Sequence, residues 1–421
     1  MRANNVNTSG AAEQGKTEAR PIAAMAAIAM AAACLLFGYE FIRTASTVLF
    51  QDAYGTKHLP LMMALMPPAV LLALYGYGFL LSRFGPARAL LFTSGAAAAL
   101  LIACYFAIVA GLAPATGVLY IVREAYIVVV LEQYWSLINS TLTHARAKRL
   151  NGPITGIASL GSILGADILS RYAEPWGTEC FVLLTAASLV PAGIFSWLAY
   201  RLAGEPVPAP EEAGGRQGHL ALRLFRQSRY LVWLAVLIAL TQVMSTMLEL
   251  RFYGLAEEAY PAKDARAAYL GGFWRNLNIL AGGLQFVGAP LLLHALPLRV
   301  THALIPLIHL GTCLALLLHP TLGTGALAYM TFKGLDYSLF RAGKEILYIP
   351  LSFDMRYRAK EVIDAFVYRF SKGVMGGLTE GAGLLLALPG QAYPAVAMVA
   401  AVVWLPLVLR LTKQSPSGKQ A

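Results

Sequence analysis

The chain alternates long apolar runs with short polar segments, and this pattern predicts its secondary structure. A helix that crosses the hydrocarbon core of a bilayer needs about 20 consecutive, mostly apolar residues. Twelve runs meet this condition, and they lack the short alternating segments of a membrane β-barrel. The predicted helices cover residues 21–50, 59–82, 88–111, 115–142, 152–172, 178–201, 230–255, 267–294, 300–319, 322–351, 361–388 and 392–411. The sequence therefore predicts an all-α membrane protein with twelve transmembrane helices.

Composition supports this fold class and argues against several functions. Of the 421 residues, 58% are apolar and 13% are charged, and the mean hydropathy is +0.60, far above that of soluble domains. The four cysteines stand singly in apolar runs, without the spacing of a metal or redox site. Motifs for a nucleophile elbow or a phosphate-binding loop are also absent. We therefore expect no metal, no cofactor and no enzymatic activity.

The distribution of lysine and arginine predicts the orientation in the membrane. If the N-terminus is cytoplasmic, twenty of these residues lie in cytoplasmic segments and four lie on the opposite side. Such a bias places both termini in the cytoplasm. The net charge of +11 is scattered over short loops and forms no single basic patch, so nucleic acid is not expected as a partner.

A hydrophilic segment, residues 202–229, divides the twelve helices into two sets of six. It begins rich in proline, glutamate and glycine and ends basic and amphipathic, as a surface linker does. The predicted organisation has five parts: a cytoplasmic tail (1–20), a six-helix bundle (21–201), the linker (202–229), a second bundle (230–411) and a C-terminal tail (412–421).

The two halves also share a sequence repeat with an offset of 212 residues. Arg-Ala-Lys occurs at 146–148 and at 358–360, and each copy is followed by two glycines at the same spacing, Gly161 and Gly165 or Gly373 and Gly377. The same offset pairs Glu124 with Asp336 and Glu132 with Lys344. Two pseudo-symmetric six-helix bundles joined by a cytoplasmic linker resemble the major-facilitator architecture, which binds substrates near the membrane midplane.

Eighteen charged residues lie inside the predicted helices and more than one residue from either end, and each costs on the order of 2.5–3.5 kcal/mol at the bilayer centre. Charges at this depth are expected to face a polar cavity or one another. On a regular helix, Lys344, Arg341 and Asp336 lie at about 20°, 80° and −60° from Lys333, so these residues share one face. Arg369 and Lys372 are neighbours on the next helix. This cationic wall predicts an anion site, although interhelical ion pairs or cytoplasmic gates would also explain single residues.

Two further residue types complete the candidate site. Buried carboxylates could pair with the cations or carry coupling protons, and the candidates are Glu40, Glu124, Glu249 and Asp336. Aromatic side chains near the charges could stack on a planar group, although packing is the commoner role of such residues. These are Tyr126, Tyr134, Trp135, Phe252, Tyr253, Trp274, Tyr337 and Tyr348.

Several segments resemble the nucleotide transporters (ATP/ADP translocases) of obligate intracellular bacteria and of plastids. The specific part is "KEILYIPL" (344–351) with "RAKEVIDAFVYRFSK" (358–372), and weaker similarity covers most of the chain. The resemblance implies a major-facilitator fold, transport of nucleotides and charged helix residues that contact phosphates. Carried over by motif, these residues are Arg43, Glu124, Glu249, Lys344, Arg369 and Lys372.

The chain departs from this family at three places. A Lys-Asp pair of the family is replaced by Ser46 and Thr47, a Trp-Lys pair by Phe252 and Tyr253, and an expected aspartate by Arg341. The loss of two lysines argues against strict ATP/ADP exchange. It indicates an anion with less charge or a different shape.

The sequence therefore predicts a monomeric, multi-pass transporter of the bacterial inner membrane, surrounded by membrane lipids, that moves an organic anion such as a nucleotide by alternating access. Arg43, Lys333, Arg341, Lys344, Tyr348, Arg369 and Lys372 would bind the substrate. Two other hypotheses remain open at this stage: a proton-coupled exporter of a small metabolite such as a siderophore, and a lipid-handling or scaffold protein that transports nothing.

Overall fold

The structure, a computed structural model, describes residues 7–141, 144–204, 225–226, 228–349, 351, 362–386 and 388–413. Every regular segment within these ranges is helical. The first six long helices are α1 (Asn7–Tyr54), α2 (Leu59–Phe84), α3 (Pro86–Val109), α4 (Pro114–Thr141), α5 (His144–Trp176) and α6 (Cys180–Ala203), with the short turn η1 (Thr56–His58) after α1. Gly55 ends α1 with a φ of 79°, a conformation that favours glycine.

The second half of the chain is also helical, and three π-helical segments interrupt or precede its helices. The elements are α8 (Arg229–Ala259), α9 (Lys263–Gly283), η2 (Leu284–Gly288), α10 (Ala289–Ala295), α11 (Leu298–Leu318), α12 (Leu322–Leu335), η3 (Asp336–Phe340), α13 (Arg341–Tyr348), η5 (Val362–Val367), α14 (Tyr368–Leu385) and α15 (Ala392–Lys413). The predicted all-α fold is confirmed.

Nine helices in the described ranges are long and apolar enough to cross a membrane. They match nine of the twelve predicted spans. The other three predictions, 152–172, 322–351 and 361–388, correspond to α5, to α12 with η3 and α13, and to η5 with α14. These elements are helical but more charged, which is why hydropathy distinguishes them less clearly.

The chain divides into two compact units. Unit 1 contains Met1–Ser46 and Ala69–Gly214, and unit 2 contains Thr47–Pro68 and Gly215–Ala421. The last turns of α1 and the first turns of α2 therefore belong with the second half of the sequence. Most of the predicted linker, 202–229, lies outside the described residues, so the predicted domain boundaries stay a prediction.

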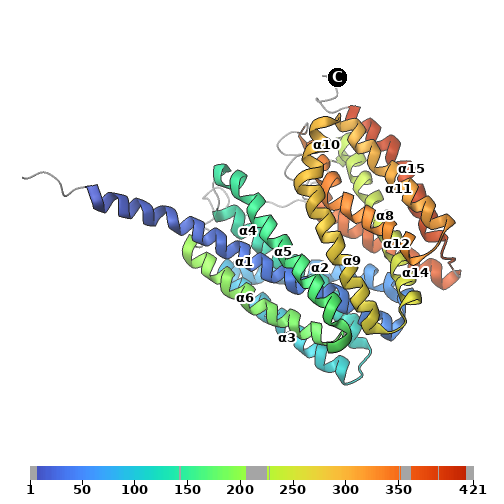
Figure 1. The fold of residues 1–421 in the computed structure, drawn as a ribbon, viewed down its shortest axis with the longest axis horizontal. Helices are drawn as coiled ribbons and strands as arrows, with labels where there is room; N and C mark the ends of the chain where they lie inside the picture. Colours follow the sequence, from blue (N-terminus) through green and yellow to red (C-terminus); the bar gives the residue numbers. More distant parts are fainter. Residues whose placement is uncertain are drawn as a thin grey trace, which may run out of the picture. The chain divides into compact units, whose positions relative to one another are not determined.

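Within unit 1, α3 packs against both α4 and α6 (Figure 1), and two glycines bring α5 against α1. A Cβ atom on Gly161 would strike the backbone oxygen of Ala33, and a Cβ atom on Gly165 would strike that of Phe37. Small residues four positions apart allow two membrane helices to approach this closely. The glycine spacing found in the repeat therefore sets the α1–α5 contact.

In unit 2, Gly373, the equivalent of Gly161, makes a different contact together with Gly376, which is not part of the repeat. Gly373 and Gly376 of α14 face α2, where added Cβ atoms would meet Pro67, Met63 and the backbone oxygen of Pro60. Elsewhere in this unit, α8 packs against α12, α14 and α15, and α11 packs against α12 and α15 (Figure 1). The second Arg-Ala-Lys, 358–360, lies outside the described residues.

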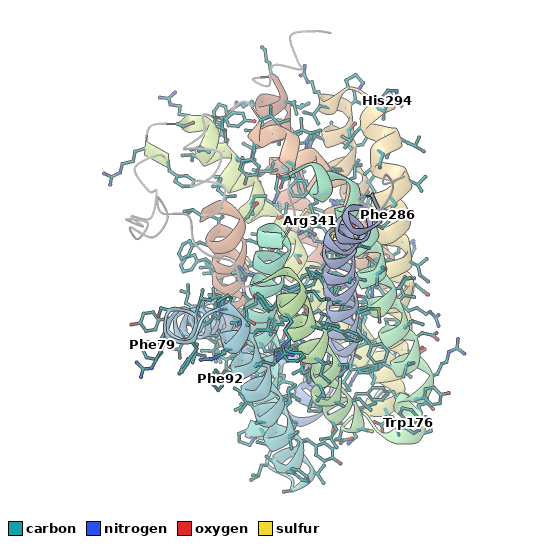
Figure 2. The ribbon with its side chains drawn as sticks, turned by 90° about the vertical axis from the view of Figure 1, so that its left-hand side faces the viewer. Phe79, Phe92, Trp176, Phe286, His294 and Arg341 are labelled. Atoms are coloured by element: carbon teal, nitrogen blue, oxygen red, sulfur yellow. The ribbon has the colours of Figure 1, made fainter. Side chains whose placement is uncertain are left out.

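Many large apolar side chains lie on the exterior of the helices. Figure 2 labels three of them, Phe79, Phe92 and Phe286, which are 63%, 51% and 46% exposed. Exposed apolar surface on this scale is unfavourable in water and favourable in the hydrocarbon of a membrane. The exteriors of both units therefore agree with the membrane location that the sequence predicts.

Candidate functional site

The strongest cluster of predicted site residues in unit 2 joins α13 to η5. The Nζ atom of Lys344 donates to Oδ1 of Asp364 at 2.7 Å, and the hydroxyl of Tyr348 donates to the same oxygen at 3.2 Å. The carboxylate is not sealed off, because 28% of the Asp364 side chain is exposed. Lys344 is thus held by a carboxylate that a competing anion could replace.

A second predicted cation, Lys372 of α14, pairs with Glu249 of α8. Its Nζ atom lies 2.9 Å from Oε2 of Glu249, and the two side chains are 18% and 6% exposed. A pair in a low-dielectric environment is costly to form from water, and breaking it by removing one partner is costlier still. The pair therefore links α8 to α14. It also stabilises the charge of Lys372 among the apolar helices.

Lys333 of α12 has a different environment. Its Nζ atom donates to Oγ of Ser245 at 2.9 Å and lies 5.6 Å from the ring centroids of both Tyr329 and Tyr337. Cation–π attraction operates at these distances. Only 5% of the residue is exposed, so Lys333 is stabilised by a hydroxyl and by aromatic rings.

The predicted common face of Lys333, Asp336, Arg341 and Lys344 assumed a regular helix, and the structure corrects this assumption. The π-helical segment η3 separates Lys333 from Arg341. Each residue added to a turn rotates the following side chains by about 100°. Arg341, labelled in Figure 2, is exposed, whereas Lys333 is buried. Lys333, Arg341 and Lys344 nevertheless all act electrostatically on Asp336.

The remaining unit 2 candidates have the following positions. Asp336 begins η3 and is half-buried. Arg369 is half-buried on α14, three residues before Lys372. Sequence spacing correctly makes these two cations neighbours on one helix.

Unit 1 contains a separate charged network around α1 and α4. Arg43 forms an ion pair with Glu40, one turn earlier on α1. Arg123 of α4 donates to the backbone oxygen of Arg43 at 3.0 Å and to Oγ of Ser46 at 3.1 Å. It also pairs with Glu124 at 3.1 Å. Arg123, which sequence reasoning did not include among the site residues, therefore positions the part of α1 that carries Arg43.

Two of the departures from the nucleotide-transporter pattern have structural roles. Ser46 is fully buried and accepts the hydrogen bond from Arg123. Phe252 lies within an aromatic cluster, 4.4 Å from the ring of Phe273 and 5.4 Å from that of Tyr329, and the adjacent Tyr253 is only 2% exposed. These aromatic residues pack the core of unit 2.

Unit 2 also holds polar contacts that the sequence did not reveal. The backbone N–H of Thr56 donates to Oε2 of Glu257 at 3.0 Å, and Nδ1 of His58 lies 3.7 Å from Oε1 of Glu380. These contacts fasten η1 to α8 and α14. No local sequence signal indicates them, because about 200 residues separate Thr56 from Glu257.

Comparison with known proteins identifies the part of the chain that carries these charges. Residues 307–415 match the family model described as TLC ATP/ADP transporter. We call this matched segment, about a quarter of the chain, the TLC domain. This TLC domain extends from α11 to α15 and includes Lys333, Lys344, Asp364, Arg369 and Lys372, whereas Glu249, the partner of Lys372, lies before it.

Curated relatives resemble a larger part of the chain at low identity. ADP,ATP carrier protein 3 of Rickettsia bellii is 22% identical over 307 residues, which are 61% of this chain and 61% of that protein. ADP,ATP carrier protein 1 of Chlamydia trachomatis is 23% identical over 344 residues, which are 70% of this chain and 65% of that protein. The chain thus aligns with about three-fifths of the length of these carriers.

Solved structures show the fold. The peptide transporter PepTSo of the POT family aligns with a TM-score of 0.67, covering 93% of this chain and 98% of that one at 13% identity. The nucleoside transporter NupG aligns with a TM-score of 0.64, covering 92% and 98% at 11% identity. The TLC domain therefore belongs to a chain with the major-facilitator type of fold, as the internal repeat predicts.

The geometry suits one kind of chemistry. The cations of the TLC domain are lysines and arginines on its helices, and at least two of them are held by carboxylates. A ligand carboxylate offers the same charge and acceptor oxygens as a protein carboxylate, and a phosphate offers more of both. Such cations can exchange a protein carboxylate for a ligand without being left unpaired.

Proposed function

We propose that the protein is a secondary transporter that moves an organic anion, namely a nucleotide or a related phosphorylated metabolite, by alternating access. The observation that carries this proposal is the position of the Lys344–Asp364 pair inside the TLC ATP/ADP transporter domain. In the proposal the transporter is a monomer in a bacterial inner membrane, with both termini in the cytoplasm.

The cations of the site have a common role in this proposal. Lys344 and Lys372 bind anionic groups of the substrate, with Arg369, Arg43, Lys333 and Arg341 as further contacts and Tyr348 as a hydrogen-bond donor. Asp364 and Glu249 hold the two lysines when no substrate is bound. A ligand shifts a conformational equilibrium only if it binds one conformation more tightly than the other. Exchange of partners at these lysines supplies this difference between the empty and the loaded carrier.

The proposal also predicts the substrate's charge. Ser46, Phe252 and Tyr253 occupy positions at which the resemblance leads us to expect charged or larger residues, and in this structure they are buried parts of the packing. Fewer cations are therefore available for phosphate groups. We infer that nucleotides with one or two phosphates fit the site better than ATP does.

A ligand panel on the purified protein tests the substrate class. Because a ligand that binds only the folded state raises the melting temperature, we expect AMP or ADP to raise it more than ATP, and adenosine to leave it unchanged. The same nucleotide should drive counter-substrate-dependent uptake into proteoliposomes. An equal shift with neutral adenosine, or efflux of a siderophore-like metabolite driven by a pH gradient alone, would contradict the proposal.

Neutralising Glu249 tests the exchange of partners. In Glu249→Gln the carboxylate of Glu249 no longer competes for Lys372, so binding of the nucleotide should tighten, by roughly tenfold if this competition was worth about 1.4 kcal/mol. Turnover should fall, because the empty carrier loses the Lys372–Glu249 pair that re-forms when the substrate leaves. Calorimetric binding and uptake rates would therefore change in opposite directions.

The matched control is Glu258→Gln, since Glu258 lies on the same helix, is 68% exposed at its side chain and pairs with Arg251. This variant should leave both binding and turnover at their original values. If Glu249→Gln weakened binding instead, Glu249 would be a direct contact of the substrate and no competitor for Lys372.

A further inference from the structure

An apolar groove runs along unit 1 between α3 and α6. It has a volume of about 440 Å³ and is lined by Leu91, Ser94, Gly95, Ala98, Leu189, Val190, Gly193, Ile194 and Trp197. The lining residues of α3 recur at helical spacing, and the two glycines, Gly95 and Gly193, leave space in the groove. A Cβ atom on Gly95 would meet no atom within 4 Å, and one on Gly193 would only touch Leu91 at 4.0 Å.

The walls of the groove are apolar and accessible from outside the unit. Val190 is 60% exposed, Ile194 is 57% exposed and Trp197 is 38% exposed. Both helices have the length and hydropathy of membrane spans. The groove therefore opens to the hydrocarbon of the bilayer, where an acyl chain is the apolar ligand at hand.

One end of the groove is cationic. Successive spans run in opposite directions, so the start of α3 and the end of α6 lie at the same end. Arg88 is three residues from Leu91 on α3, and Arg201 is eight residues from Gly193 on α6. At a rise of 1.5 Å per residue, these arginines lie about 4.5 Å and about 12 Å along their helix axes from the two groove residues. The guanidinium of Arg201 lies 4.0 Å from the ring centroid of Trp197, and both arginines are exposed.

No carboxylate offsets these charges on the two helices. Neither α3 nor α6 contains an aspartate or a glutamate. Arg83, at the end of α2 just before α3, adds a further exposed cation. The predicted orientation puts this end at the cytoplasmic leaflet, whose surface attracts basic residues through its anionic lipids.

We propose that the α3–α6 groove is a binding site for one anionic phospholipid, with an acyl chain over Gly95 and Gly193 and the phosphate at Arg88 and Arg201. The apolar groove selects a chain, and the arginines select a negative headgroup. This site shares no residue with the proposed transport site, so the proposal does not depend on the substrate. The bound lipid holds α3 and α6 together along their open side.

Trp197 provides a local probe for the test. The protein, reconstituted in mixtures of phosphatidylglycerol and phosphatidylcholine, is given one of the two lipids with brominated acyl chains, which quench tryptophan on contact. The signal of Trp197 is the difference between the wild type and Trp197→Phe, since the chain has six tryptophans. Quenching is normalised to unbrominated lipid with the same headgroup.

We expect brominated phosphatidylglycerol to quench Trp197 at several-fold lower mole fraction than brominated phosphatidylcholine. Arg88→Gln and Arg201→Gln should each lower this preference by about fivefold, the contribution of one basic residue near an anionic surface. Gly95→Leu and Gly193→Leu should reduce quenching by both lipids, because leucine side chains occupy the groove.

Two matched variants serve as controls. Arg410→Gln removes an arginine that lies 5.9 Å from the ring of Trp233 in unit 2, and Gly78→Leu adds a leucine on α2 where a Cβ atom meets nothing within 4 Å. Neither should change the signal of Trp197. Equal quenching by the two lipids, or a preference that survives in the Arg88→Gln/Arg201→Gln double variant, would overturn the proposal.

Discussion

Reversing the Lys344–Asp364 pair is expected to abolish nucleotide uptake while the protein stays folded. In Lys344→Asp/Asp364→Lys the opposite charges remain as close as in the wild-type pair, which places Nζ 2.7 Å from Oδ1. The mutual attraction is therefore kept. The cation, however, moves from α13 to η5, so a substrate phosphate no longer meets it at the original position.

The single variant Lys344→Ala should also stop transport, and for a related reason. Loss of a charged hydrogen bond to the ligand weakens binding by roughly ten- to hundredfold. Asp364 is left without its cation, but its partial exposure limits the loss of stability to roughly 1–2 kcal/mol. Uptake into proteoliposomes and the melting temperature, measured together, separate these two effects.

The charge reversal distinguishes a transport role from a structural one. A pair that only fastened α13 to η5 would work in either orientation, and the reversed variant would then transport at the wild-type rate. That result would falsify the assignment of Lys344 to the substrate. The control is Lys413→Ala at the exposed end of α15, which should leave both uptake and melting temperature unchanged.

Alanine at Gly165 or Gly161 is expected to destabilise the protein strongly, although only one methyl group is added. The added Cβ atoms would overlap the backbone oxygens of Phe37 and Ala33 on α1. Backbone atoms cannot rotate away as a side-chain tip can, so α1 and α5 must separate. Such overpacking costs about 1–3 kcal/mol, and leucine at either position should prevent folding.

The same helix offers a matched control for this prediction. A Cβ atom on Gly156 meets nothing within 4 Å, and alanine is the better helix former by about 0.8–1.0 kcal/mol. Gly156→Ala should therefore melt at the wild-type temperature or slightly above it, whereas Gly165→Ala should melt lower and give less monodisperse protein. Equal melting of the two alanine variants would mean that α5 is free to move away from α1.

The candidate site was only partly predictable. Lys344 and Lys372 are recognisable because a charge is costly in an apolar helix. Glu249 is recognisable as a pairing carboxylate for the same reason. Which cation each carboxylate holds is not predictable, since Asp364 is 20 residues from Lys344 and Glu249 is 123 residues from Lys372. The regular helix assumed from Lys333 to Lys344 is wrong, because the π-helical segment η3 lies between them. The three cations of that segment, Lys333, Arg341 and Lys344, nevertheless act electrostatically on Asp336.

The sequence determines the membrane helices of this protein, their repeat and the glycines that join them. The physical reason is that a helix in lipid satisfies its own backbone hydrogen bonds, so apolar length alone predicts it. The tertiary structure decides which carboxylate holds which cation and where a groove opens between α3 and α6. Both depend on how each helix is rotated against its neighbours, a property set by contacts between distant residues such as Gly165 and Phe37.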